Sequence, residues 1–326
     1  MNLAAIVAAF VFLILLLVLP QLVPVYFVVL ATRIIIFAIF AMSLDLLMGY
    51  TGLPSLGQAA YFGMGSYTAA VIAINGGTSF FGLLAAAGLA SAILAALFGI
   101  LVLRSAAQRI YFMMLTLALA QVVWALAFQW RSVTNGDDGL SGIGKAFVGS
   151  WQLSDPNSFY LVAAAVGVTC GVALLLIANS PFGLTLMGIR DSSSRMLALG
   201  YNVWLHRYVA FVLAGTFTGI AGAMLALQNE IASPGQLSIA TSAEAMLMVI
   251  LGGAGTMIGP AIGACIVVLL EFLVGHETER WMSILGIIYI VVVLCAPRGI
   301  YPMLRSAVRR LARRRSVPIS IPVARR

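Results

Sequence analysis

Charged residues are scarce in this sequence. They make up 9% of its 326 residues, whereas 62% are hydrophobic, and the mean hydropathy is +1.08. So few polar groups cannot cover the surface of a soluble globule of this size. The composition therefore excludes a soluble domain and predicts an all-α polytopic membrane protein.

Cysteine pairs and metal-ligand motifs are also absent from the sequence. Cys170, Cys265 and Cys295 each lie in an apolar segment without close pairing or metal-ligand spacing, which indicates small packing residues. His206 and His276 lie at the edges of apolar segments, and no serine has a base partner in sequence. We therefore predict no metal site, and an intramembrane enzyme is the weakest functional interpretation.

The positive charge is concentrated at one place. The net charge is +8, and eight arginines lie between Arg305 and Arg326. A basic tail beside a membrane span favours the cytoplasmic side and anionic lipid, so no nucleic-acid partner is expected. We expect one membrane domain over residues 1–304 and a basic tail over 305–326. The first apolar run has no basic region before it, so we interpret it as a retained span and not as a signal peptide.

Apolar segments long enough to cross a bilayer recur along the chain, given that each span needs about 20 residues. They are predicted at residues 3–19, 25–48, 59–75, 81–103, 110–130, 159–177, 208–227 and 282–295, with two half-length or bent helices within 241–274. This layout gives about ten crossings, with both termini inside.

The distribution of charge agrees with this layout. Segments 104–109, 179–207 and 298–326 hold fourteen of the eighteen basic residues. The loops at 131–157, 228–240 and 275–281 hold six of the ten acidic residues. By the positive-inside rule, the first three segments are cytoplasmic.

Two interruptions rich in glycine and proline lie in the two halves of the chain, at residues 49–58 and 252–260. Irregular backbone cannot face lipid, and paired interruptions of this kind point to the substrate path of a transporter. The candidate path residues are Asp45, Gly52, Ser55, Gly57, Gln58, Glu244, Gly252, Gly253, Gly255 and Gly259.

Two charges within the second span need an explanation, because charge is costly inside a bilayer. Arg33 lies near the start of its helix and could snorkel outward. Asp45 lies about three helical turns further on, too far for direct contact with Arg33 in one straight helix. We expect a partner for Asp45 on another helix, or a local water.

The loop at 131–157 contains a near match to the phosphate-loop pattern. The run from Gly139 to Ala146 has the glycines and Lys145, but Ala146 replaces the hydroxyl that would hold magnesium. No buried strand precedes the run either. We interpret the match as chance and predict no nucleotide site in this chain.

Residues 180–200 form the longest polar stretch that keeps helical apolar spacing. The stretch begins at Ser180-Pro181 and ends at Gly200, a plausible C-terminal cap. A predicted apolar stripe comprises Leu186, Ile189, Met196 and Leu199, while Arg190, Asp191 and Arg195 are expected to stay in water. The pattern suits either a plain connector or a surface that meets a partner.

A pair of small residues, Gly215 and Gly219, marks the span at 208–227. Such pairs allow helices to pack closely, either within the protomer or against a second subunit. Spacing alone also leaves two transport mechanisms open. One is a permease driven by a separate ATPase, and the other is an ion-coupled secondary carrier with Asp45, Glu244 and Glu271 as relay groups.

Collinear motifs over residues 43–301 distinguish these two mechanisms. The motifs are Leu44–Tyr67, Tyr111–Ala120, Asn135–Ile143, Ser180–Gly183, Val249–Pro260 and Pro297–Gly299. In these segments the sequence resembles the branched-chain amino acid ABC-transporter permeases of the LivM type.

The resemblance implies the ABC-importer permease fold and a set of partners. These are a homologous second permease, two ATPase subunits that use ATP and Mg, and a periplasmic or extracellular solute-binding protein. The chain itself would be no enzyme and hold no cofactor. It would lie in a bacterial or archaeal cell (inner) membrane and import branched-chain amino acids, with urea, short amides or aromatic acids as alternative substrates.

In that family the segment matching Pro181–Gly200 couples to the ATPase. The residues so implied here are Phe182, Gly183, Ile189, Arg190, Asp191, Arg195, Met196, Leu199 and Gly200. Leu184 and Met187 stand where the family often has basic residues, and Ser193 and Ser194 where acidic residues are found. Docking is therefore expected to rely mainly on apolar packing. Asp45 also departs from the family's usual asparagine.

Arg190→Glu and Gly200→Pro are each expected to abolish transport while the protein still inserts in the membrane, because both alter the coupling segment and not a span. Uptake assays combined with membrane fractionation measure the two effects. Normal uptake by either variant would contradict the coupling assignment.

Overall fold

The computed structural model describes residues 20–21, 23–77, 79–105, 109–149, 151–275 and 299–303, with Gly286 and Ile290. The spans predicted at 3–19 and 282–295, the basic tail and Cys295 lie outside the described residues. Cys170 is buried in the main apolar core and Cys265 is half-buried, and both are free thiols.

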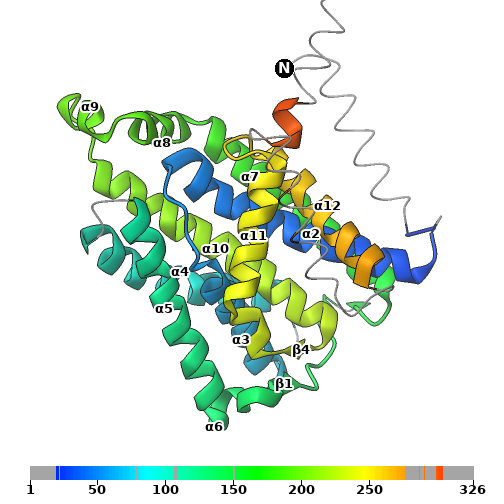
Figure 1. The fold of residues 1–326 in the computed structure, drawn as a ribbon. Coiled ribbons are helices and arrows are strands. Elements are labelled where there is room, and N and C mark those ends of the chain that lie inside the picture. Colours follow the sequence, from blue (N-terminus) through cyan, green and yellow to red (C-terminus); the bar gives the residue numbers. More distant parts are fainter. Residues whose placement is uncertain are drawn as a thin grey trace, which may run out of the picture.

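Eight helices coincide with predicted spans (Figure 1). They are α2 (Val25–Asp45), α3 (Gln58–Ile74), α4 (Phe80–Ser105), α5 (Arg109–Gln129), α7 (Pro156–Asn179), α10 (Val203–Asn229), α11 (Ile239–Gly252) and α12 (Ile258–Gly275). Among the described residues, five helical segments, which contain α2, α4, α5, α7 and α10, are long and apolar enough to cross a membrane. The predicted all-α polytopic membrane fold is confirmed.

The helix ends follow from local capping. α7 begins with Pro156, whose missing N–H costs nothing in a first turn. Asn202 caps α10 by accepting a hydrogen bond from the Leu205 amide at 3.1 Å. Ser238 caps α11 in the same way through the Thr241 amide at 3.4 Å. These side chains satisfy amides that have no partner within their own helix.

The outer helices are apolar on both faces. On α4, Leu89, Ile93 and Leu97 recur every four residues and are exposed, whereas Ala87 and Ala95 are buried against the bundle. An exposed apolar stripe would be unfavourable in water but suits contact with lipid. The exposed stripe therefore marks the lipid-facing side of this helix.

Helix α10 lies at the centre of the bundle, where it packs against α4, α3 and α2. The small residues of α10 allow these helices to approach it closely. A Cβ on Gly222 would overlap the Phe62 carbonyl of α3, and a Cβ on Gly219 would overlap Ser91 of α4. A Cβ on Gly215 would also overlap Ala95 of α4, so both members of the predicted pair, Gly215 and Gly219, pack within the protomer.

The two loops expected on one side of the membrane meet through short strands. The first loop contains α6 (Arg131–Thr134), η2 (Gly136–Asp138), β1 (Leu140–Ser141), β2 (Phe147–Val148) and β3 (Trp151–Gln152), and the second contains β4 (Ile231–Ala232) and η3 (Pro234–Leu237). β1 pairs antiparallel with β4, and β2 pairs with β3. Figure 1 shows these loops at the end of the bundle opposite α8 (Pro181–Asp191) and α9 (Ser193–Ala198).

Gly222→Ala is expected to destabilise the protein by about 1–3 kcal/mol, because the added Cβ meets backbone of α3 that cannot rotate away. Thermal unfolding in detergent measures the change. Gly144→Ala is the matched control, since a Cβ there meets nothing within 4 Å. Equal stability of the two variants would contradict the close packing of α10 on α3.

Candidate coupling and translocation site

The first interruption begins with a change of helix type. After Asp45, α2 continues as one π-helical segment, η1 (Leu46–Thr51), and Gly52 then ends the helix with φ of 73°. The chain reaches α3 through residues 53–57. Gly52, Ser55 and Gly57 are buried, and so is Gln58 at the start of α3. This irregular backbone is therefore shielded from lipid by protein, as expected.

The second interruption is a tight turn between α11 and α12. Gly253 has φ of 112° and Gly255 has φ of 82°, a region in which glycine carries no steric penalty. A Cβ on Gly252 would overlap the carbonyl of Gly259, so the two helices meet closely at this turn. The two half-length or bent helices predicted within 241–274 are thus α11 and α12, which pack against each other.

Asp45 joins the two interruptions. Its side chain is fully buried. Oδ1 accepts a hydrogen bond from the Gly255 amide at 2.7 Å, and Oδ2 accepts one from the Met257 amide at 3.0 Å. The expected partner on another helix is instead the backbone of the turn between α11 and α12. Sequence spacing could not identify it, because Asp45 and Gly255 are 210 residues apart.

Arg190 connects α8 to the two interruptions. Its Nη1 donates a hydrogen bond to the carbonyl oxygen of Gly49 in η1. A Cβ on Gly255 would lie 3.1 Å from this nitrogen, so the guanidinium also borders the second interruption. Arg190 is exposed on α8, as expected, and its guanidinium also donates to a backbone carbonyl in the interrupted region.

The backbone at position 49 lies so close to Asp45 and Gly255 that only glycine fits there. A Cβ on Gly49 would overlap both the Asp45 carboxylate and the Gly255 amide nitrogen. We call Asp45, Gly49, Arg190, Gly255 and Met257 the junction. It joins α8, the end of α2 and the turn after α11 in one set of polar contacts.

The predicted apolar stripe of residues 180–200 is divided between two helices and two environments. Ser192 ends α8 and caps α9, accepting a hydrogen bond from the Arg195 amide at 3.4 Å. Leu186 and Ile189 are buried against the protein's own helices. Ile189 is therefore not available to a partner in this structure, although the stripe was expected to meet one.

The remaining predicted coupling residues lie at or near the surface. Leu199 is 68% exposed, and Asp191 and Arg195 are exposed too. Phe182 stacks on His206, with ring centroids 5.8 Å apart. Met196 packs against Gly188 of α8.

The structure explains why two positions of the 180–200 segment are glycine. A Cβ on Gly183 would overlap the carbonyl of Ala178, so α8 starts in close contact with the end of α7. Gly200 has φ of 87°, which confirms the predicted C-terminal cap.

Exposed leucines that the stripe omitted also lie on these helices. Leu184 of α8 is 61% exposed and Leu197 of α9 is 59% exposed. Both lie at the end of the bundle where α8 and α9 are found (Figure 1). Helical spacing missed Leu197 because the break at Ser192 resets the periodicity, and it missed Leu184 because that residue lies on the face of α8 opposite Leu186.

A buried polar cluster lies behind the first interruption. The Ser43 and Thr218 hydroxyls are 2.7 Å apart, and Thr218 donates to Gln58 Oε1 at 3.4 Å. Ser242 accepts from the Ala59 amide at 2.9 Å, in the first turn of α3. Sequence reasoning found Gln58 but missed the other side chains, because a single serine or threonine in an apolar helix carries no signal of its partner.

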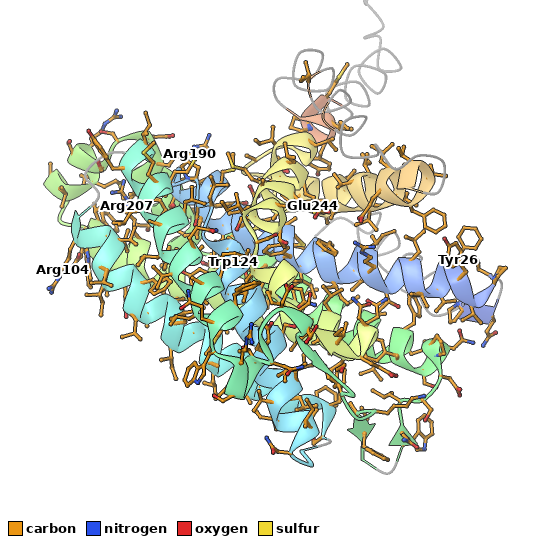
Figure 2. The ribbon with its side chains drawn as sticks, turned by 60° about the horizontal axis from the view of Figure 1, so that its bottom comes forward. Tyr26, Arg104, Trp124, Arg190, Arg207 and Glu244 are labelled. Carbon is orange, nitrogen blue, oxygen red and sulfur yellow. The ribbon has the colours of Figure 1, made fainter. Side chains whose placement is uncertain are left out.

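Arg33 has a partner that the sequence did not identify. It donates through Nη2 to Glu271 Oε1 of α12 at 2.9 Å, while its side chain remains 41% exposed. Glu244 of α11 interacts electrostatically with both members of this ion pair. Figure 2 shows Glu244 in the middle of the molecule, away from Arg190. Glu244 therefore belongs to a separate charged group and not to the junction.

These features define a class of protein. Two interrupted helical elements are joined inside a membrane bundle, and a short polar helix, α8, contacts them from one end. This arrangement suits a transport subunit that is moved by a partner outside the bilayer.

Comparison with known proteins gives the family. The match to the family described as "Branched-chain amino acid transport system / permease component" spans residues 26–294. The chain belongs to this family, and it is a multi-pass membrane permease subunit and not an enzyme. Members of this family work with ATPase and binding-protein partners.

The chain is also similar to two individual permease proteins. The chain is 27% identical to the high-affinity branched-chain amino acid transport system permease protein LivM of Salmonella typhimurium and 28% identical to that of Escherichia coli. Each match covers 84% of this chain and 70% of the relative. No solved structure matches the chain.

Asp45→Ala is expected to destabilise the protein by about 2–5 kcal/mol, because two buried amides lose their acceptor. Asp45→Asn keeps one acceptor oxygen and is expected to cost less. Thermal unfolding of the purified protein gives the order of the variants.

Asp191→Asn serves as the control, since that carboxylate is exposed on α8. It is expected to unfold within about 0.5 kcal/mol of the wild type. An Asp45→Ala protein as stable as this control would show that the junction does not hold the two interruptions together.

Proposed function

We propose that this chain is the transmembrane permease subunit of a binding-protein-dependent ABC importer that moves branched-chain or related small amino acids into the cell. The observation that carries the proposal is the junction. Through Arg190, α8 contacts the interrupted backbone at Gly49 and borders the turn at Gly255. A motor that moves α8 would therefore act directly on both interruptions.

The proposed assembly contains a second, homologous permease, two ATPase subunits and an external solute-binding protein. ATP and Mg are used by the ATPase subunits. In support, the glycine-rich run at 139–146 leads into β2 and not into a helix, so it lacks the helix N-terminus on which a phosphate loop depends. The substrate is delivered by the binding protein.

The proposed mechanism is alternating access driven through α8. Closure of the ATPase dimer pulls or tilts α8, and Arg190 transmits this movement to the carbonyl of Gly49. Asp45 carries it to Gly255 and Met257, so that α2 and the α11–α12 pair move together around the path. The exposed surface of Leu184, Leu197 and Leu199, with Asp191 and Arg195, supplies the docking face.

The proposed orientation places α8, α9 and both termini in the cytoplasm of a bacterial or archaeal cell, with the chain in the cell (inner) membrane. Figure 2 supports this orientation, since Arg104, Arg190 and Arg207 gather at one end while Tyr26 lies at the other. Excess Lys and Arg mark the cytoplasmic side of a membrane protein.

The secondary-carrier alternative is less well supported. A relay carboxylate must exchange a proton or an ion, whereas both oxygens of Asp45 are bound by backbone amides. Glu271 is paired with Arg33. Two of the three carboxylates that a carrier would use therefore have structural partners.

Uptake is expected to require ATP hydrolysis and the external binding protein. The test reconstitutes the complete complex in proteoliposomes and measures uptake of labelled leucine with ATP, with a non-hydrolysable analogue, and without binding protein. Proteoliposomes of this chain alone serve as the comparison under a proton or sodium gradient. Gradient-driven uptake by this chain alone would overturn the importer in favour of a carrier.

A further inference from the structure

The exposed apolar stripe of α4 ends in an arginine. Leu97, Leu101 and Arg104 are spaced by four and then three residues, so they lie on one face of the helix. Both leucines are more than half exposed, and Arg104 is exposed in the last turn. Since the stripe faces lipid and the apolar span ends at Arg104, this side chain lies at the level of the lipid headgroups.

Helix α10 begins beside Arg104. A Cβ on Gly88 would lie 3.2 Å from the Ile220 side chain, and one on Gly99 would lie 3.1 Å from the Tyr208 ring. The order of these contacts shows that α4 and α10 run in opposite directions. The same register, continued for about one turn beyond Gly99, brings Arg104 level with the first turns of α10. The last turn of α4 and the first turns of α10 therefore form one surface.

The start of α10 adds a second arginine and two aromatic rings to this surface. Trp204 and Tyr208 stack with their ring centroids 5.1 Å apart, and Trp204 is partly exposed. Arg207 lies between them in the sequence, and Figure 2 shows it at the same end of the molecule as Arg104. Tryptophan and tyrosine are enriched where acyl chains meet headgroups, because their rings are apolar at one end and polar at the other.

The positive charge of this surface is not offset by acidic residues of the same segments. Residues 97–105 and 199–212 contain Arg104, His206 and Arg207 but no aspartate or glutamate. Arginines at the level of the headgroups attract anionic lipids. We call Leu97, Leu101, Arg104, Trp204 and Arg207 the α4–α10 surface.

We propose that the α4–α10 surface binds an anionic phospholipid of the leaflet on the α8 side of the bundle. The headgroup phosphate lies against Arg104 and Arg207, the glycerol region lies beside Trp204, and an acyl chain follows Leu97 and Leu101. Charge selects the headgroup, and the apolar stripe holds the chain. The inference rests on the membrane class of the protein and not on the proposed import function.

A soluble protein partner is the other occupant that a basic surface could have, because an ATPase subunit is proposed to dock on the neighbouring α8 and α9. The apolar part of the surface favours lipid instead. Leu97 and Leu101 continue a stripe that includes Leu89 and Ile93, all exposed within the apolar span. A soluble partner does not reach that depth of the bilayer, whereas an acyl chain fills it.

Trp204 provides a direct test. The full chain is reconstituted in phosphatidylcholine vesicles that contain a minority of brominated phosphatidylglycerol or of brominated phosphatidylcholine, since bromine quenches the fluorescence of a nearby tryptophan. The signal of Trp204 is the difference between each protein and its Trp204→Phe counterpart. Phosphatidylglycerol is expected to be preferred about fivefold or more at Trp204, and Arg104→Gln is expected to lower this preference about fivefold.

Arg131→Gln is the matched control. It removes the same charge beside another exposed tryptophan, Trp130, at the opposite end of the bundle. There the two aspartates of η2 offset the charge, and a Cβ on Gly136 of η2 would lie 3.1 Å from the Arg131 side chain. The preference at Trp204 is expected to stay unchanged. All variants keep the arginines of residues 305–326, so any attraction of these for anionic lipid cancels.

Equal quenching of Trp204 by the two brominated lipids would overturn the inference, and so would an equal effect of Arg131→Gln. Arg104→Lys keeps the charge and is expected to keep the preference; a loss with lysine as well would contradict recognition by charge. If Arg104→Gln leaves quenching unchanged but releases ATPase subunits from the purified complex, the surface is a protein interface and the lipid site is overturned. ATP-dependent uptake is measured separately, so failure of the lipid site leaves the importer standing.

Discussion

The hydrogen bonds from Asp45 to the Gly255 and Met257 amides are the contact on which the centre of this protein depends. Inside a membrane bundle, backbone amides that leave a helix have no water to bind, and each must find a partner in the protein. One buried carboxylate satisfies two of them. In doing so it fixes the end of α2 against the turn between α11 and α12, and so joins the two halves of the chain.

Helix α8 has two different faces. Leu186 and Ile189 anchor it to the bundle, and Arg190 reaches the interrupted backbone at Gly49. Its outward side presents Leu184 and Asp191. A helix anchored by packing on one side and exposed on the other can transmit a movement without being part of the path.

Some polar groups elsewhere in the bundle are also paired between helices that are distant in the sequence. Arg33 and Glu271 neutralise each other between α2 and α12, and Ser43 bonds Thr218 between α2 and α10. Among the described residues, other buried polar atoms have no hydrogen-bond partner, including Gln58 Nε2, the Tyr67 and Tyr160 hydroxyls and Glu271 Oε2.

The sequence by itself determined the membrane class, the eight described helices to within a few residues and both interruptions, because apolar length and glycine or proline content act locally. It also identified Asp45 and the segment at 180–200 as unusual. Only the tertiary structure decided which groups meet: Asp45 with Gly255, Arg190 with Gly49, and Arg33 with Glu271. These pairs are 141 to 238 residues apart. Partner choice over such distances depends on how the helices pack, which no local pattern in the sequence encodes.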